Sequence, residues 1–467
     1  MSAYRNEHDL LGDKNVPSAA YYGVHTLRAL ENFPITGISI AVYPDLIRAL
    51  AQIKLAAAKA NEQLGLLEAP LAEAIVAACQ EVIAGKLHDQ FVVDVIQGGA
   101  GTSTNMNANE VIANLALEAM GHEKGEYQHL HPNNDVNMAQ STNDAYPTAI
   151  RVGLLLGHDF LLTALDKLIQ SFAAKGLEFG HVLKMGRTQL QDAVPMTLGQ
   201  EFRAFATTLG EDLQHLKRMA PALLTEVNLG GTAIGTGINA DPAYQKLAVE
   251  RLAIISGHPV VPAADLIEAT SDMGAFVLFS GMLKRTAVKL SKICNDLRLL
   301  SSGPRTGINE INLPARQPGS SIMPGKVNPV IPEAVNQVAF EVIGNDLALT
   351  IAAEGGQLQL NVMEPLIAYK ILDSIRLLTR SMDMLRELCI DGITANEAHC
   401  RQLMENSIGL VTALNPYIGY ENATRIAKTA LESGRGVLEL VREEKLLDEA
   451  TLADILLPEN MIAPRLI

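Results

Sequence analysis

Apolar seams with a heptad spacing constrain this chain more than any other feature of its sequence. Two seams alternate steps of four and three residues, one through Ile371, Ile375, Leu378, Met382, Leu385 and Cys389, the other through Leu283, Ala287, Leu290, Cys294 and Leu297. Such spacing places apolar side chains on one side of an α-helix, where they pack against a partner helix. We expect long helices over about 147–179, 197–227, 265–300, 332–353 and 364–390, and shorter ones from about residue 394. Long helices joined by short loops predict an all-α helix bundle.

The composition narrows the choice of partners. The chain has 467 residues, with 37 Lys and Arg against 52 Asp and Glu, and a formal net charge of −15. That acidity argues against nucleic acid or an anionic membrane as a partner. Hydrophobic residues make up 48% of the chain. Charged residues make up only 19%, which is below the about 25% found in a usual globular domain. Because no run of eighteen apolar residues is present to cross a membrane, we interpret the apolar surplus as subunit interfaces.

The cysteines and the amino terminus favour a cytoplasmic protein. Cys79, Cys294, Cys389 and Cys400 lie far apart, with no C-x-x-C pair. We expect reduced, buried thiols and neither a disulfide framework nor a zinc site. The first residues lack the apolar core of a signal peptide.

One loop combines two serines and a lysine between glycines and prolines. It reads Gly319-Ser320-Ser321-Ile322-Met323-Pro324-Gly325-Lys326-Val327-Asn328-Pro329. Proline fixes φ and glycine permits unusual φ, so the segment is predicted to be a loop with a defined path. It can place a hydroxyl beside an ammonium, which acidifies the hydroxyl or holds an anion; the alternative is a simple turn between helices. A P-loop is excluded by the spacing and by Val327, which stands where Ser or Thr is required.

Three more loops are crowded with hydroxyl and amide side chains, at 97–107, 133–144 and 185–195. The first is rich in glycine and leads into a helix expected to begin around Asn107, where free backbone N–H groups can bind an anion. Ser, Thr and Asn are also ordinary turn and cap residues, which by itself explains the second loop. The stretch 230–237 lacks the third glycine of a dinucleotide loop, and no strand precedes it. We interpret that stretch as a tight connection between helices.

The side chains of these loops together suggest which ligand the protein binds and which kind of reaction it catalyses. Thr, Ser, Asn and one Lys suit the binding of small carboxylates. We find no metal-ligand cluster, dinucleotide loop or Cys/His nucleophile pair in the sequence, so we expect chemistry without a cofactor. Removal of a carbon-bound proton beside a carboxylate fits best, because neutral donors can stabilise the charge that develops there. Ser320 or Ser321, beside Lys326, is the candidate base.

The loop 319–329 resembles the signature of the aspartase/fumarase superfamily. Other stretches resemble the same family: Tyr21–Thr26, Gly98–Asn109, Gln140–Asp144, Gly186–Thr188 and Leu360–Pro365. The resemblance implies an all-α fold with three domains, expected at 1–141, 142–393 and 394–467. It also implies a homotetramer whose central helices form one bundle, with each active site drawing loops from three chains.

The resemblance also assigns roles to residues. Ser320 is implied to be the base that takes the Cβ proton, and Ser321 to hold the developing aci-carboxylate. The other implied substrate ligands are Thr102, Ser141 and Thr142 for the β-carboxylate, Lys326, Asn328 and Thr188 for the α-carboxylate, and Asn143 near the amino group. The intermediate then expels ammonia and gives fumarate. No metal ligand and no required cofactor are implied, and activation by a divalent cation stays open.

Two features favour the ammonia-releasing branch of the superfamily, which acts on L-aspartate. Fumarate hydratases have His after the threonine of the Gly-Arg-Thr motif, paired with a glutamate, whereas this chain has Gln189 there and keeps Glu333 at the partner position. Gln189 can bind an ammonium or a carboxylate, but it cannot carry a proton at neutral pH. The run Asn361-Val362-Met363-Glu364-Pro365 also resembles the ammonia-releasing branch. One alternative is a fumarate hydratase. The other is a non-catalytic structural protein, which is an alternative because the superfamily includes lens crystallins.

Overall fold

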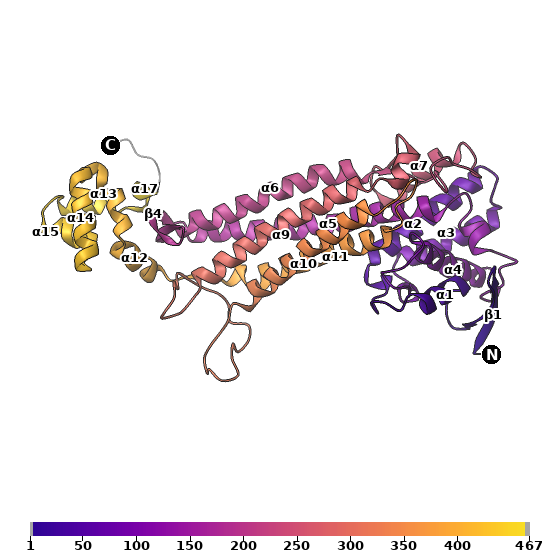
Figure 1. Cartoon of the computed structure of the whole chain (residues 1–467), viewed down its shortest axis with the longest axis horizontal. Helices are drawn as coiled ribbons and strands as arrows, with labels where there is room; N and C mark the ends of the chain where they lie inside the picture. The colour runs from indigo at the N-terminus through magenta and orange to yellow at the C-terminus, as the bar shows by residue number, and fades with distance from the viewer. Residues whose placement is uncertain (1–2, 463–467) are drawn as a thin grey trace. The chain divides into compact units, whose positions relative to one another are not determined.

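The computed structural model describes residues 3–462. Contacts divide the chain into two compact units, which we describe separately. Unit 1 consists of Met1–Leu162, Gln214–Arg285 and Phe340–Leu378, and unit 2 of Thr163–Leu213, Thr286–Ala339 and Thr379–Ile467. The long helices α5 (Thr142–Glu178), α6 (Leu198–Leu224), α9 (Gly274–Leu300), α10 (Val330–Glu354) and α11 (Glu364–Leu388) are all present (Figure 1). The all-α class is therefore confirmed, while the division at 1–141, 142–393 and 394–467 stays a prediction.

Unit 1 is built around a helix that is buried on nearly every side. It begins with an antiparallel hairpin of β1 (Tyr4–Asp9) and β2 (Gly12–Pro17), then α1 (Val24–Asn32). Helix α2 (Pro44–Gln63) packs against α3 (Ala69–Ile83), α4 (Thr102–Ala119) and α7 (Tyr244–Ser256). Short elements complete the unit: 3-10 turns at Ile40–Val42 and His88–Gln90, a π-helical turn at Pro132–Val136, α8 (Leu266–Ser271), and β5 (Glu226–Val227) parallel to β6 (Val261–Pro262).

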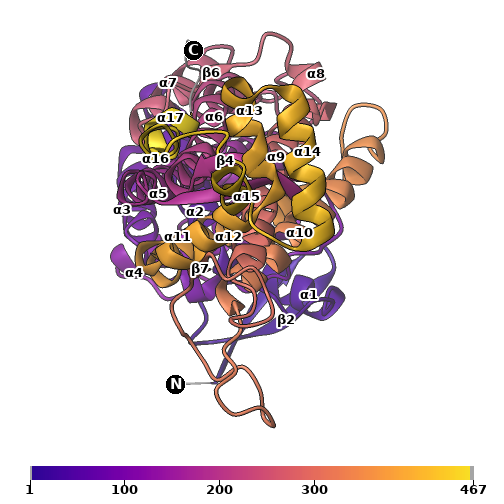
Figure 2. The same ribbon diagram turned by 90° about the vertical axis from the view of Figure 1, so that its left-hand side faces the viewer.

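Unit 2 ends in a group of short helices with its own apolar core. They are α12 (Glu397–Asn406), α13 (Val411–Ile418), α14 (Tyr420–Ser433), α15 (Val437–Glu443), α16 (Glu449–Ile455) and α17 (Pro458–Met461). Helices α13 and α14 lie side by side (Figure 2), and Leu414, Ile426 and Val441 are fully buried among them. The 3-10 turns Ile390–Gly392 and Ile408–Leu410 and the pair β7 (Ile311–Asn312) and β8 (Thr394–Ala395) also belong to this unit. The predicted shortening of helices after residue 394 is confirmed.

The two apolar seams that predicted the helices are buried. Every residue of the two seams is at most 5% exposed. Helix α5 has the length and composition of a membrane span, but its residues Leu154, Leu161 and Leu165 are fully buried. Those side chains pack within the protein, as in a core helix.

Helix α5 starts at Thr142, earlier than the expected start at 147. Ser141 N–H donates to Asp144 Oδ1 at 2.9 Å, and Asn143 N–H donates to Ser141 Oγ at 3.2 Å, which satisfies two donors at the helix start. Pro147 has no N–H for the carbonyl of Asn143, and Asn228 Nδ2 donates to that carbonyl instead, at 3.0 Å. A distant asparagine therefore lets a proline lie inside the helix.

The prediction of one helix over about 265–300 was wrong. Helix α8 ends at Ser271 and α9 begins at Gly274. Asp272 has an extended backbone, and its carboxylate accepts from Gly274 N–H at 2.9 Å. Asp265 caps α8 by accepting from Ile267 N–H and Glu268 N–H. Asp side chains that bond to nearby backbone groups compete with a continuous helix.

Candidate active site

In unit 2, the loop 319–329 closes on itself. Gly319 N–H donates to the Lys326 carbonyl at 2.7 Å, and Asn328 Nδ2 donates to the Gly319 carbonyl at 2.9 Å. A Cβ at position 319 would lie 2.7 Å from the Lys326 oxygen, so only glycine fits. The loop walls an open cavity of about 460 Å³ that is lined by both Ser320 and Lys326. The structure thus brings the predicted base and the predicted cation to one cavity, with Ser321 exposed beside them.

The Ser320 hydroxyl is held by two backbone donors. Its Oγ accepts from Ile322 N–H at 3.2 Å and from Met323 N–H at 3.1 Å. Hydrogen bonds to the charged form of an acid favour that form. Two aligned N–H groups therefore make the Ser320 alkoxide easier to form.

Thr188 and Gln189, also in unit 2, lie at the tip of a hairpin where the sequence predicted only a polar loop. Strand β3 (Leu183–Thr188) pairs with β4 (Gln191–Thr197), and Gln189 and Leu190 occupy the turn with φ of +55° and +62°. Two left-handed residues in a two-residue hairpin turn match the right-handed twist of the strands. The turn leaves Thr188 and Gln189 exposed.

A buried ion network anchors that hairpin. Lys184 Nζ lies 2.5 Å from Glu201 Oε2 and 2.7 Å from Glu310 Oε2, and Arg187 lies 2.7 Å from Glu310 Oε1. Burial alone would lower the pKa of Lys184, but the two carboxylates raise it above its ordinary value. Glu310 thereby fixes the strand that carries Thr188.

In unit 1, Thr102 occupies the first position of α4, five residues before the expected start of that helix. Its Oγ1 donates to the Gly99 carbonyl at 2.7 Å, and its side chain is exposed. Gly101 precedes it with φ of +88°, and a Cβ there would lie 2.2 Å from the Tyr146 ring. The glycine-rich stretch therefore sets where α4 begins and where Thr102 lies.

Ser141, Thr142 and Asn143 form a second group in unit 1. Thr142 Oγ1 accepts from Asn105 Nδ2 at 3.1 Å, which links this group to α4. Asn143 Nδ2 donates to the Ala233 carbonyl at 2.8 Å.

The stretch 230–237 packs directly on this group. Gly230 N–H and Thr232 N–H donate to Asp144 Oδ2 at 3.0 and 2.9 Å. Burial raises the pKa of Asp144 to about 6, against the effect of these backbone donors. The sequence indicated only a helix connection here, whereas the stretch also braces Ser141–Asn143.

Lys54 on α2 is a further residue of this region that could not be predicted from the sequence. It is fully buried, and its Nζ donates to Asn105 Oδ1 at 2.7 Å, Asn137 Oδ1 at 2.9 Å and Gln140 Oε1 at 2.8 Å. Burial lowers its pKa to about 7. A charged or partly charged donor therefore orders the amides that flank Thr102 and Ser141. A lone lysine in an alanine-rich helix carried no signal beyond its polarity.

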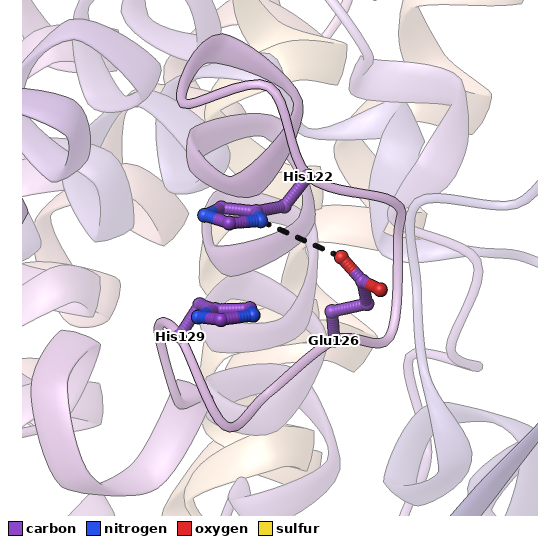
Figure 3. A group of neighbouring side chains, drawn as sticks. All are labelled: His122, Glu126 and His129. Carbon is purple, nitrogen blue, oxygen red and sulfur yellow. Dashed lines mark ion pairs between the residues drawn. The ribbon is translucent and has the colours of Figure 1, made fainter.

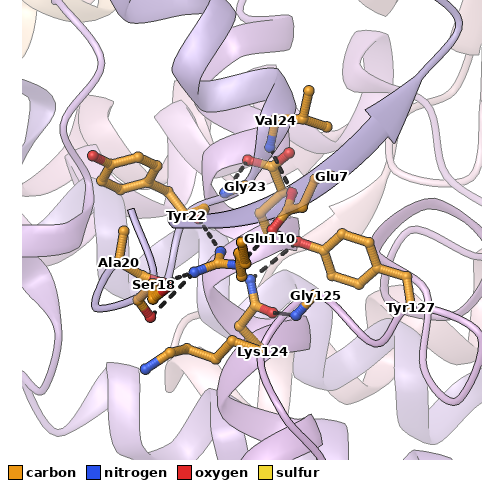
Figure 4. Close-up of polar contacts among 12 residues, drawn as sticks. Glu7, Ser18, Ala20, Tyr22, Gly23, Val24, Glu110, Lys124, Gly125 and Tyr127 are labelled. Atoms are coloured by element: carbon orange, nitrogen blue, oxygen red, sulfur yellow. Dashed lines mark hydrogen bonds and ion pairs between the residues drawn. The ribbon is translucent and has the colours of Figure 1, made fainter. Parts of the chain in front are cut away.

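The stretch Tyr21–Thr26 is held by two buried carboxylates, Glu7 and Glu110 (Figure 4). Glu110 accepts from the N–H groups of Gly23 and His25, both at 2.8 Å, and Glu7 accepts from Val24 N–H at 2.8 Å. Carboxylates at this position satisfy the unpaired donors at the start of α1. Burial, with Glu7 nearby, raises the pKa of Glu110 to about 7.

Two family models match the sequence over most of its length. The model described as "Lyase" matches residues 12–344, and the model described as "Fumarase C C-terminus" matches residues 410–463. The chain belongs to the aspartase/fumarase superfamily.

Curated members of the superfamily resemble the chain from end to end. A protein of Pseudomonas aeruginosa named aspartate ammonia-lyase is 81% identical over 100% of this chain and 98% of its own length. A protein of Escherichia coli with the same name is 58% identical over 98% of this chain and 96% of its own length.

Solved structures of the superfamily share the fold. A Brucella melitensis structure described as fumarate lyase:delta crystallin bound to cobalt has 60% identity and a TM-score of 0.95, covering 99% of this chain and 100% of that one. A class II fumarase from Schistosoma mansoni has 35% identity and a TM-score of 0.91, covering 98% and 99%.

The superfamily motifs fall into two sets. Thr102, Ser141, Thr142 and Asn143 lie in unit 1, and Thr188, Gln189, Ser320, Ser321, Lys326 and Asn328 in unit 2. Each set is ordered by its own hydrogen bonds; the joining of the two sets in one site stays a prediction. The motif at 361–365 is structural in unit 1, where Asn361 Nδ2 donates to the carbonyls of Ala352 and Ala353 at the end of α10.

Proposed function

We propose that the chain catalyses the reversible removal of ammonia from L-aspartate, giving fumarate. The observation that carries this proposal is the 81% identity, over the full chain, to a protein named aspartate ammonia-lyase. The class II fumarase is much less similar, at 35%. Gln189 at the position of the hydratase histidine agrees with this choice.

The test is a comparison of two substrates with the purified protein. L-Aspartate should yield fumarate and ammonia in equal amounts, and L-malate should yield no fumarate at the same enzyme concentration. Formation of fumarate from L-malate but not from L-aspartate would show that the chain is a hydratase. Activity on neither substrate would favour the structural-protein alternative.

In the proposed reaction, Ser320 takes the Cβ proton. The electron pair of the C–H bond moves onto the β-carboxylate, which becomes a dianionic aci-carboxylate. That pair then forms the double bond while the C–N bond breaks and ammonia leaves. The two backbone donors to Ser320 Oγ support this role, since they lower the free energy of the alkoxide.

The remaining side chains are proposed to bind the substrate. Thr102, Ser141, Thr142 and Ser321 would donate to the β-carboxylate, where neutral donors stabilise the charge that appears in the transition state. Lys326, Asn328 and Thr188 would hold the α-carboxylate, and Asn143 and Gln189 would lie near the amino group. No metal or organic cofactor has a role in these steps.

We also propose a homotetramer, with each site shared among three subunits. Helix α10 supports this, because it carries an exposed apolar stripe of Phe340, Ile343, Leu347 and Ile351, with 60%, 37%, 63% and 62% exposure. These residues lie on one face, and an exposed face of this kind usually marks an interface. A cytoplasmic location, without nucleic acid or membrane partners, agrees with the net charge of −15 and the four buried free cysteines.

Subunit complementation tests the shared site. Thr102→Val and Ser320→Ala should each be inactive, and mixed subunits refolded together should regain part of the activity. Recovery requires that Thr102 and Ser320 of one site come from different chains. Absence of recovery in tetramers shown to be mixed by mass spectrometry would place both residues of a site in one chain.

A further inference from the structure

Two histidines and a glutamate converge on the loop between α4 and the π-helical turn at Pro132–Val136. One nitrogen each of His122 and His129 and one oxygen of Glu126 lie within 4.8 Å of one another. The two imidazole rings are stacked, with centroids 3.9 Å apart and planes 9° from parallel. Figure 3 shows both rings with an edge toward the Glu126 carboxylate, and His122 Nδ1 lies 3.5 Å from Glu126 Oε2.

Local hydrogen bonds, mostly between backbone groups, order the loop that carries these side chains. Gly121 reverses the chain after α4 with φ of +86°, and His122 N–H returns to the Leu117 carbonyl at 2.9 Å. Glu123 N–H donates to Glu126 Oε2 at 3.1 Å, and His129 N–H donates to the Glu126 carbonyl at 3.0 Å. The three candidate ligands thus occupy one short, internally bonded segment.

Other charges leave the cluster suited to a cation. Lys124, the lysine of this loop, pairs with Glu118 at 3.2 Å and lies over the Tyr21 ring at 4.3 Å. The 3.5 Å separation of His122 Nδ1 and Glu126 Oε2 exceeds a good hydrogen bond. No strong internal bond between these two groups therefore has to be broken before they bind a ligand.

We propose that His122, Glu126 and His129 form a binding site for a divalent transition-metal ion such as Zn²⁺, Ni²⁺ or Co²⁺. Two imidazoles and one carboxylate are a donor set that these ions prefer, whereas Mg²⁺ and Ca²⁺ prefer oxygen ligands alone. Bonds of about 2.0–2.2 Å require the ligand atoms to close in by roughly 1 Å and the rings to turn out of their stack. The side chains have the freedom to do this, since His122 and Glu126 are 31% and 40% exposed and His129 is exposed. Three protein ligands leave further coordination positions for water.

The metal would brace a segment that leads to the candidate active site. The loop continues through Pro132–Val136 to Asn137, whose side chain accepts a hydrogen bond from Lys54. A ligand that binds only the folded state stabilises it in proportion to the logarithm of its concentration over Kd. The site is separate from the proposed chemistry, and the proposed function does not depend on it.

Calorimetric titration of untagged protein with NiCl₂, and separately with ZnCl₂, tests the proposal. We expect one saturable site per chain and an increase in Tm when the metal is added. His129→Gln and Glu126→Gln should each weaken binding by at least about tenfold, because each removes one of three ligands. His181→Gln is the matched control, since His181 faces Glu397 at 3.2 Å as an exposed pair that, among the described residues, has no third potential ligand. This variant should leave Kd unchanged.

A visible absorption spectrum with CoCl₂ gives a second readout. Co²⁺ bound by two imidazoles should give d–d bands that His129→Gln weakens and His181→Gln does not. The proposal is overturned if wild-type protein binds no metal saturably. It is also overturned if both ligand variants bind with the wild-type Kd.

Discussion

Replacing Gly101 by alanine tests whether a tight backbone contact positions Thr102, and Gly121 supplies a matched control. The two glycines flank the same helix, α4, with φ of +88° and +86°. Alanine at either position therefore has the same left-handed strain, about 1–2 kcal/mol. Their surroundings differ, because a Cβ at 101 would lie 2.2 Å from Tyr146 Cδ1, whereas a Cβ at 121 meets nothing within 4 Å.

The difference in free energy of unfolding between the two variants follows from that contact. Tyr146 is 2% exposed, so its ring cannot swing into solvent. Forcing an extra carbon into a packed site costs about 1–3 kcal/mol. Gly121→Ala should lose about 1–2 kcal/mol, and Gly101→Ala about 2–5 kcal/mol, relative to wild type.

Urea unfolding at equal protein concentration measures this difference, and steady-state kinetics on L-aspartate measure its effect on the site. Gly101→Ala should raise KM because Thr102 follows the strained position directly, while Gly121→Ala should keep the wild-type KM. Equal stabilities and equal KM values for the two variants would contradict this prediction, since the Tyr146 contact would then neither strain the chain nor position Thr102.

Three other variants probe the proposed chemistry and its electrostatics. Ser320→Ala should lower kcat by at least about a hundredfold, as loss of a general base does; a variant that retains most of its kcat excludes Ser320 as the base. Lys326→Ala should raise KM by about ten- to a hundredfold, from the loss of one charge-assisted hydrogen bond of about 1.5–3 kcal/mol, and an unchanged KM would contradict its role. Glu110 has its pKa raised to about 7 by burial, so its folded form binds an extra proton between pH 4.5 and 7. Wild-type stability should therefore fall by about 3 kcal/mol as the pH rises through this window. In Glu110→Gln, the free energy of unfolding measured in urea should not show this loss as the pH rises. If the wild type and this variant lose stability equally between pH 4.5 and 7, the raised pKa of Glu110 is contradicted.

The long helices could be predicted because their apolar spacing is a local pattern that burial then uses. Ile371, Leu378 and Leu385 recur on one face, and the structure buries that face. Helix ends were harder to predict, since they depend on distant partners. The start of α5 at Thr142 relies on Asn228, whose Nδ2 donates to the Asn143 carbonyl. Pro147 has no N–H that could donate to that carbonyl.

Some residues of the candidate site could likewise be predicted from local sequence, and others depend on distant partners. Ser320 and Lys326 could be predicted from a short motif, and the structure places both at one cavity. The role of Lys54 could not be predicted, because its three amide partners come from α4 and from the stretch before α5. The convergence of His122, Glu126 and His129 likewise depends on turns of the loop, which the spacing of the three residues did not indicate.

The product formed from fumarate in ammonium-containing buffer, identified by proton NMR, distinguishes an ammonia-lyase from a hydratase in one experiment. Water and ammonium are then both available, and the enzyme itself selects which one adds to the double bond. We expect L-aspartate as the product, with no L-malate above the level of a control without enzyme. Accumulation of L-malate without L-aspartate would contradict it.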